Sequence, residues 1–162
     1  MKNILHVYKV YYPEMFGGIQ KAIHDIANET CAFNFKSRVF SLSTIPNPKP
    51  FKVGCHEAIT ARQQLYVAST GFSYPAVGLF QRFAAEADII HYHFPWPFMD
   101  VLHLISRTKK PTIVTYHSDI VKQSGLLQLY KPLMHRFLKN MDRIVATSPN
   151  YLQTSPVLQR YR

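Results

Sequence analysis

A histidine and an aspartate stand at the end of an apolar, strand-like segment. Residues 111–119 read PTIVTYHSD, so His117 and Asp119 follow a run of β-branched and aromatic residues. Serine and aspartate at such a point often begin a turn, because their side chains bond the nearby backbone. In open α/β sheets, however, ligands bind outside the carboxyl ends of the strands. The segment leaves both interpretations open, a turn or a binding edge.

Two adjacent glycines, Gly17 and Gly18, lie where the first predicted helix begins. A helix start offers free backbone N–H groups and the positive end of the helix dipole, and glycine places no side chain in the way. This arrangement suits a phosphate group, although a glycine pair before a helix is also typical of a tight turn. The fingerprint GxGxxG is absent, which argues against a nicotinamide or flavin dehydrogenase.

Two further histidines alternate with aromatic residues in the segment IIHYHF. His91 and His93 therefore share one face of the predicted strand, while Tyr92 and Phe94 share the other. Two imidazoles could converge on a metal ion, but local spacing supplies no third ligand. Neutral histidines with hydrogen bonds at strand ends are the other interpretation, and we expect no metal site. Trp96, which lies between two prolines, could stack on a sugar or cover the core.

A basic amphipathic segment covers residues 120–141. Lys131, Arg136 and Lys139 are mixed there with leucines and aromatic residues, a pattern typical of a helix that lies on an anionic membrane surface. The same helix could pack its apolar face on the sheet and expose its basic face to water. The two interpretations are compatible, because an exposed basic face is what an anionic membrane would meet. We expect Lys131, Arg136 and Lys139 to face a membrane.

The elements that must position these residues alternate between short β-rich runs and helical patterns. Such alternation favours βαβ units and a parallel sheet with helices on both faces, a Rossmann-like α/β fold. The predicted strands are residues 3–10, 37–43, 57–68, 88–94, 111–117 and 142–148. The predicted helices are residues 18–33, 120–141 and a last one from Ser148, its N-cap, to the end. Residues 45–54, rich in proline and lysine, predict an exposed loop.

Composition limits the class of protein. The 162 residues are 47% hydrophobic and 17% charged, which is typical of one globular domain. A net charge of +10 favours an anionic partner such as nucleic acid, a membrane surface or a phosphorylated ligand. Cys31 and Cys55 show no CxxC spacing and no secretory leader precedes them, so we expect two reduced core cysteines in a cytoplasmic protein. No apolar run approaches a membrane span, so any membrane contact should be peripheral.

Four segments in this order resemble a known family. They are PEMFGGIQKAIHDIA, ADIIHYHFPWP, KPTIVTYHSDIVKQ and DRIVATSPNYL. Together they resemble the N-terminal domain of the retaining glycosyltransferases of family 4, which have the two-domain GT-B architecture. The resemblance covers essentially the whole chain. It implies transfer of a sugar from a nucleotide-sugar donor to a glycan or lipid-linked acceptor, with retention at the anomeric carbon and without an obligatory metal or other cofactor.

The resemblance also assigns roles to particular residues. Gly17 and Gly18 match the glycine loop that approaches the donor diphosphate, and His117 matches the catalytic histidine beside the donor sugar. The expected acceptor contacts lie close to these positions: Gln20, Asp119 and Lys122. Family members build bacterial lipopolysaccharide, exopolysaccharide or glycolipids, which implies a peripheral location on the inner face of the cytoplasmic membrane.

Family members continue into a second domain that holds the nucleotide. We therefore expect residues 1–162 to be the N-terminal, acceptor-side domain, to need a C-terminal donor-binding half as partner, and to be inactive alone. A non-catalytic basic α/β module for an anionic partner is the alternative. No RNP, KH or similar motif supports a nucleic-acid partner, and the absence of a GxSxG elbow argues against an α/β hydrolase.

Overall fold

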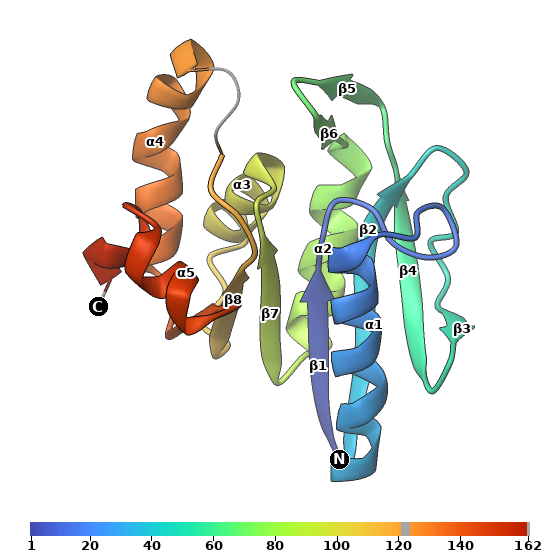
Figure 1. Cartoon of the computed structure of the whole chain (residues 1–162). Helices are drawn as coiled ribbons and strands as arrows, with labels where there is room; N and C mark the ends of the chain where they lie inside the picture. The colour runs from blue at the N-terminus through green and yellow to red at the C-terminus, as the bar shows by residue number, and fades with distance from the viewer. Residues whose placement is uncertain (121–123, 162) are drawn as a thin grey trace.

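A computed structural model describes residues 1–120 and 124–161, without the side chains of residues 124–127. Its main feature is a seven-stranded sheet in the order β3-β4-β2-β1-β7-β8-β9 (Figure 1). Neighbouring strands are parallel except for β3 and β4. The strands are β1 (Lys2–Val7), β2 (Phe35–Ser43), β3 (Phe51–Val53), β4 (His56–Arg62), β7 (Ile89–Phe94), β8 (Thr112–Tyr116) and β9 (Arg143–Ala146). The predicted Rossmann-like α/β fold is confirmed.

Two parts of the strand prediction need correction. Residues 57–68 form two strands, since β4 ends at Arg62 and β5 (Leu65–Val67) pairs with β6 (Thr70–Phe72) in a separate hairpin. Within the predicted loop 45–54 lies β3, which pairs antiparallel with β4. Its backbone partners come from that tertiary pairing, which the proline-rich composition of the loop does not indicate.

One face of the sheet is covered by α1 (Gly18–Glu29), which lies in front of the sheet in Figure 1. Its apolar stripe buries Ile23 against Tyr8 and Val39, as the helical spacing predicts. The predicted helix extended to residue 33, but the last four residues form a 3₁₀ turn, η1 (Thr30–Phe33). Asn34, in the left-handed conformation with φ 64°, ends this turn.

The opposite face is covered by α2 (Tyr74–Glu86), α3 (Pro97–Ser106) and α4 (Ser124–Lys139). Phe80, Met99 and Phe137 from these helices join Tyr92 and Val114 of the sheet in one buried cluster. The alternation in IIHYHF is thus confirmed, because the aromatic residues of β7 enter this core. None of the helices in the described part of the chain is long and apolar enough to cross a membrane.

The C-terminal helix is shorter than predicted. Ser148 caps α5 (Pro149–Thr154) by accepting a hydrogen bond from the Tyr151 N–H, as expected. The helix ends at Thr154 because Pro156 disfavours helical geometry in the residue before it, and Ser155 is extended with φ −75° and ψ 118°. A second 3₁₀ turn, η2 (Leu158–Tyr161), follows.

The cysteine prediction is wrong. Cys31, in η1, and Cys55, in the turn between β3 and β4, form a disulfide across 24 residues of sequence. Neither residue is buried in the core, and Cys55 is exposed. The fold brings the two together because α1 ends at the same edge of the sheet where β4 begins.

Candidate active site

The predicted glycine loop and His117 both lie at the carboxyl edge of the sheet. The loop follows β1 and His117 follows β8, two strands away across β7. The His117 N–H donates to the carbonyl of Phe94 at 3.1 Å, which continues the pairing of β8 with β7. The chain leaves β1 for β2 on one side and later places β7 on the other, so a topological switch point lies between β1 and β7. Ligands of open α/β sheets bind at such points.

His117 is half-buried and contacts another histidine. Its Nε2 lies 3.1 Å from Nδ1 of the fully buried His93, and the two rings are stacked. Burial lowers the pKa of His117, which favours the neutral imidazole. When the His93 Nδ1–H donates to His117 Nε2, the proton of the neutral His117 ring is on Nδ1. In that arrangement the His117 Nδ1–H is available to donate a hydrogen bond to a ligand.

The start of α1 is open to an anion. Gly17 is its N-cap and has no side chain to cap the helix, and the first turn carries no acidic residue. A Cβ atom on Gly17 would lie 2.7 Å from Oε1 of Gln20, whereas a Cβ atom on Gly18 would meet no atom of the described residues within 4 Å. Gly18 thus fronts open space at a helix end that carries partial positive charge.

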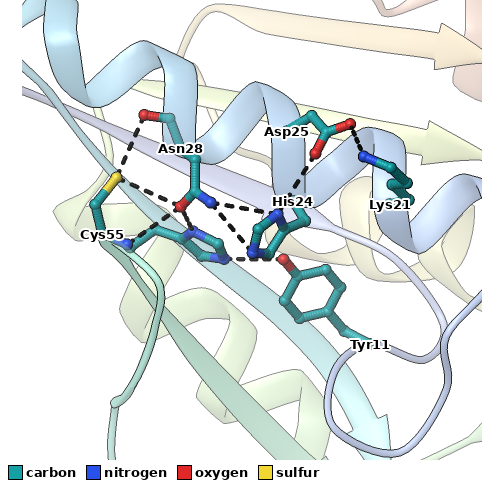
Figure 2. A network of polar contacts seen from close by, with 7 residues as sticks. Tyr11, Lys21, His24, Asp25, Asn28 and Cys55 are labelled. Atoms are coloured by element: carbon teal, nitrogen blue, oxygen red, sulfur yellow. Dashed lines mark hydrogen bonds and ion pairs between the residues drawn. The ribbon is translucent and has the colours of Figure 1, made fainter.

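The glycine loop is anchored from behind. Gln20 is buried, and its amide donates to the carbonyl of Val10 at 3.4 Å. The Tyr11 hydroxyl lies 2.9 Å from Nε2 of His56, whose Nδ1 lies 2.8 Å from Oδ1 of Asn28 in α1 (Figure 2). The side chain of Gln20 thus supports the loop, and the acceptor contact expected of it stays a prediction.

Asp119 also has partners within the chain. Its Oδ1 accepts hydrogen bonds from the Tyr116 hydroxyl at 2.8 Å and the Ser155 hydroxyl at 2.9 Å, and its backbone N–H donates to the Tyr151 hydroxyl. These contacts hold the tip of β8 against α5. The acceptor role of Asp119 stays a prediction, and Lys122 lies outside the described residues.

A pocket lies beside the glycine loop, and the sequence patterns did not predict it. It has a volume of about 560 Å³ and opens at the carboxyl ends of β1 and β2. Polar and apolar side chains line it together: Lys9, Glu14 and Gln63 with Met15, Leu42, Ile45 and Tyr66. Burial lowers the pKa of Lys9. This lysine, directly after an apolar strand, was the sequence signal that could have indicated the pocket.

The structure supplies the third histidine that local spacing could not. His6 of β1 lies beside His91 and His93, and one ring nitrogen of each lies within 4.8 Å of the others. The expectation of no metal site rested on the lack of such a third residue. Trp96, by contrast, is fully buried and donates to the carbonyl of Gly71 at 3.2 Å, so it covers the core.

The basic face of α4 is exposed as predicted. Lys131, Arg136 and Lys139 are all exposed. Arg136 also borders a pocket of about 420 Å³ that Lys109 and Lys110 line from the segment after α3. Cations from two elements therefore gather on one surface.

Comparison with known proteins gives consistent results. The model of the family described as Glycosyltransferase Family 4 matches residues 16–154. D-rhamnosyltransferase WbpZ of Pseudomonas aeruginosa is 48% identical over 160 residues, which are 99% of this chain and 42% of that protein. O-antigen chain mannosyltransferase C of Escherichia coli is 45% identical over 99% of this chain and 43% of its own length. The chain thus spans about two fifths of the length of these curated relatives.

Solved structures share the fold at low sequence identity. Sucrose-phosphate synthase of Thermosynechococcus elongatus has a TM-score of 0.69 and 18% identity over 94% of this chain and 45% of that one. A second structure of that synthase, a shorter piece, has a TM-score of 0.58 and 16% identity over 94% of this chain and 82% of that one. At this identity the likeness shows the fold alone.

Proposed function

The chain belongs to Glycosyltransferase Family 4, and from this membership we propose that it is the acceptor-side domain of an enzyme of polysaccharide synthesis. The enzyme transfers a sugar from a nucleotide-sugar donor to a glycan or lipid-linked acceptor, with retention of anomeric configuration. The similar proteins are named as a rhamnosyltransferase and an O-antigen mannosyltransferase, which supports this class of reaction. Family membership in turn argues against a non-catalytic basic module.

One observation carries the proposal: an open helix start and a half-buried histidine lie at the same edge, on either side of the switch point. When the donor binds, the N–H groups at the start of α1 face its diphosphate, and Gly18 lets the phosphate approach closely. Backbone donors fixed in place stabilise the negative charge that develops on the leaving diphosphate. They offer what a metal ion would otherwise supply, so we propose no obligatory metal or cofactor for the transfer.

His117 touches the donor sugar in this proposal. A neutral imidazole with its proton on Nδ1 can donate to a sugar hydroxyl and hold the sugar relative to the acceptor. The correct orientation of two reactants is worth several kcal/mol of the barrier. The pocket lined by Lys9 suits an acceptor with both polar and apolar parts.

The remaining proposals concern the whole protein. Residues 1–162 form its N-terminal domain, and a C-terminal half holds the nucleotide. The exposed cations of α4 attach the domain to an anionic membrane, on the cytoplasmic inner face where sugar nucleotides are available. No nucleic acid takes part.

The test is a transfer assay with the complete protein that contains this chain. Nucleotide-activated mannose and rhamnose are the donors, and NMR of the product reports the anomeric configuration. We expect transfer with retention that needs no added Mg²⁺, and no transfer by residues 1–162 alone. Inversion at the anomeric carbon, or turnover by the isolated chain, would contradict the proposal.

A further inference from the structure

Three histidines form a compact group on one face of the sheet. His6 lies directly opposite His91 in the pairing of β1 with β7, and His93 follows two residues later on the same face. His6 and His93 are fully buried, and His91 is half-buried. One ring nitrogen from each lies within 4.8 Å of the other two.

Hydrogen-bond partners orient two of these rings. His93 Nδ1 lies 3.1 Å from His117 Nε2, and His93 Nε2 lies 3.2 Å from His6 Nδ1, a hydrogen bond that a shared metal ion would replace. His91 Nε2 lies 2.7 Å from the hydroxyl of Thr115, and when its N–H donates there, His91 Nδ1 keeps its lone pair. Metal-binding histidines characteristically donate their second N–H to such a partner, which fixes the tautomer.

The geometry between His6 and His93 also fits a shared ligand. His6 Nδ1 and His93 Nε2 are 3.2 Å apart, and two nitrogens bound to one tetrahedral zinc ion at about 2.05 Å are separated by roughly 3.3 Å. Within the described part of the chain, His6 Nε2 is buried and has no hydrogen-bond partner. This unpaired nitrogen is not the one that faces His93, so the shared ligand is inferred from the Nδ1–Nε2 pair and not from the unpaired atom.

Burial of the three rings is compatible with the geometric argument, because it favours their neutral forms. Burial lowers the pKa of His91 to about 4, and it lowers the pKa of His6 and His93 well below the usual value, with a further contribution from neighbouring histidines. Neutral imidazoles keep the lone pairs that a metal needs.

We propose that His6, His91 and His93 bind one first-row divalent transition-metal ion such as Zn²⁺ or Co²⁺. Imidazole nitrogens suit these ions, whereas Mg²⁺ and Ca²⁺ prefer oxygen ligands. A fourth ligand such as water would complete a tetrahedral site. The ion cross-links β1 to β7 and fixes the His93 ring, and it takes no part in the transfer step.

The proposal is independent of the proposed function, because its test measures binding. The chain is prepared without an affinity tag, with its disulfide intact, and is freed of metal with EDTA before titration with Co²⁺. We expect one Co²⁺ per chain, with the visible absorption bands of a tetrahedral site. His6→Gln and His91→Gln should each weaken binding at least tenfold. His24→Gln changes a histidine of α1 outside the group, and it should bind as the wild type does.

A second measurement needs no variant. Of the eight histidines in the chain, Zn²⁺ should shift the ring NMR signals of the three proposed ligands and of His117, which contacts His93. The signals of His24 and His135 should stay in place. Absence of stoichiometric binding by the folded wild-type chain, equal affinity of wild type and His91→Gln, or Zn²⁺-induced shifts at His24 or His135 would overturn the proposal.

Discussion

Two residues at the tip of β8, His117 and Asp119, have different contacts although they are only two positions apart. His117 faces a line of histidines, and its ring is oriented by His93. Asp119 is bound on three sides, by the hydroxyls of Tyr116, Ser155 and Tyr151, and fixes the tip against α5. In the proposed function His117 contacts the donor sugar and needs such support, because a small displacement from the productive geometry costs much of the rate.

Gly18 and Gly17 offer a matched pair of substitutions. A Cβ on Gly18 meets no atom of the described residues within 4 Å, so Gly18→Ala should fold normally but place a methyl group where the proposed site receives the diphosphate. We expect kcat/KM of the complete enzyme for the donor to fall at least tenfold, about 1.4 kcal/mol. The measurement is steady-state kinetics together with thermal unfolding.

Gly17→Ala is the control. Its Cβ would lie 2.7 Å from Oε1 at the flexible end of Gln20, so that side chain should turn away from the Val10 carbonyl and the midpoint of thermal unfolding should fall only slightly. If Gly18→Ala loses stability and keeps its donor kinetics, the open space at the start of α1 is not the diphosphate site.

Sequence patterns correctly predicted those features of single helices and strands that depend only on residues close together in the sequence. The stripe of α1, the cap at Ser148 and the alternation in β7 are properties of neighbouring residues, and the structure confirms them. Strand β3 and the disulfide depend on pairing with distant segments. His6 reaches His91 only because β1 pairs with β7, 85 residues further along the chain. Helices α2 and α3 were also not among the elements that the sequence patterns predicted.

The basic face of α4 gives a testable prediction. Each Lys or Arg near an anionic bilayer contributes about 1 kcal/mol. Neutralising Lys131, Arg136 and Lys139 together should therefore weaken partitioning by up to about 3 kcal/mol, or roughly a hundredfold. Co-sedimentation with anionic vesicles across a salt series measures this effect. Binding should weaken as salt is added, because salt screens the attraction between charges over about 8 Å at physiological ionic strength.

The control removes the same charge elsewhere on the surface. Lys2, Lys49 and Lys52 are exposed and lie outside α4, so neutralising them should have a much smaller effect. Equal losses in both triple variants would mean that net charge alone attracts the chain to the membrane. Equal binding of the wild type to neutral and anionic vesicles would reject the electrostatic account.

At the scale of the whole molecule, buried histidines link stability to pH. Burial lowers the pKa of His56, His91 and His103 to about 4 each, and places that of His6 and His93 well below the usual value. The unfolded chain titrates near 6.5, so below that pH it binds protons that the folded state does not. The free energy of unfolding should therefore fall as the pH is lowered below about 6.5, by at most about 1.4 kcal/mol per pH unit for each histidine that stays neutral in the folded chain.

Urea unfolding at several pH values measures this slope. His56→Gln should reduce this slope by the amount that corresponds to about one bound proton. Asp100 acts in the opposite direction, because burial raises the pKa of its carboxyl, so Asp100→Asn provides a cleaner background. A flat profile between pH 6.5 and 4 in that background would mean that the histidines are not held neutral.

The proposed function places His117 at the reacting centre of a sugar transferase, and kinetics of His117→Ala in the complete enzyme test this placement. The account predicts a fall in kcat of roughly 10² or more, about 2.7 kcal/mol of transition-state stabilisation, with an unchanged circular dichroism spectrum. His135→Ala, on α4 and away from this edge, should keep its activity. A His117→Ala enzyme that folds normally and retains activity within a few-fold of the wild type would contradict the account.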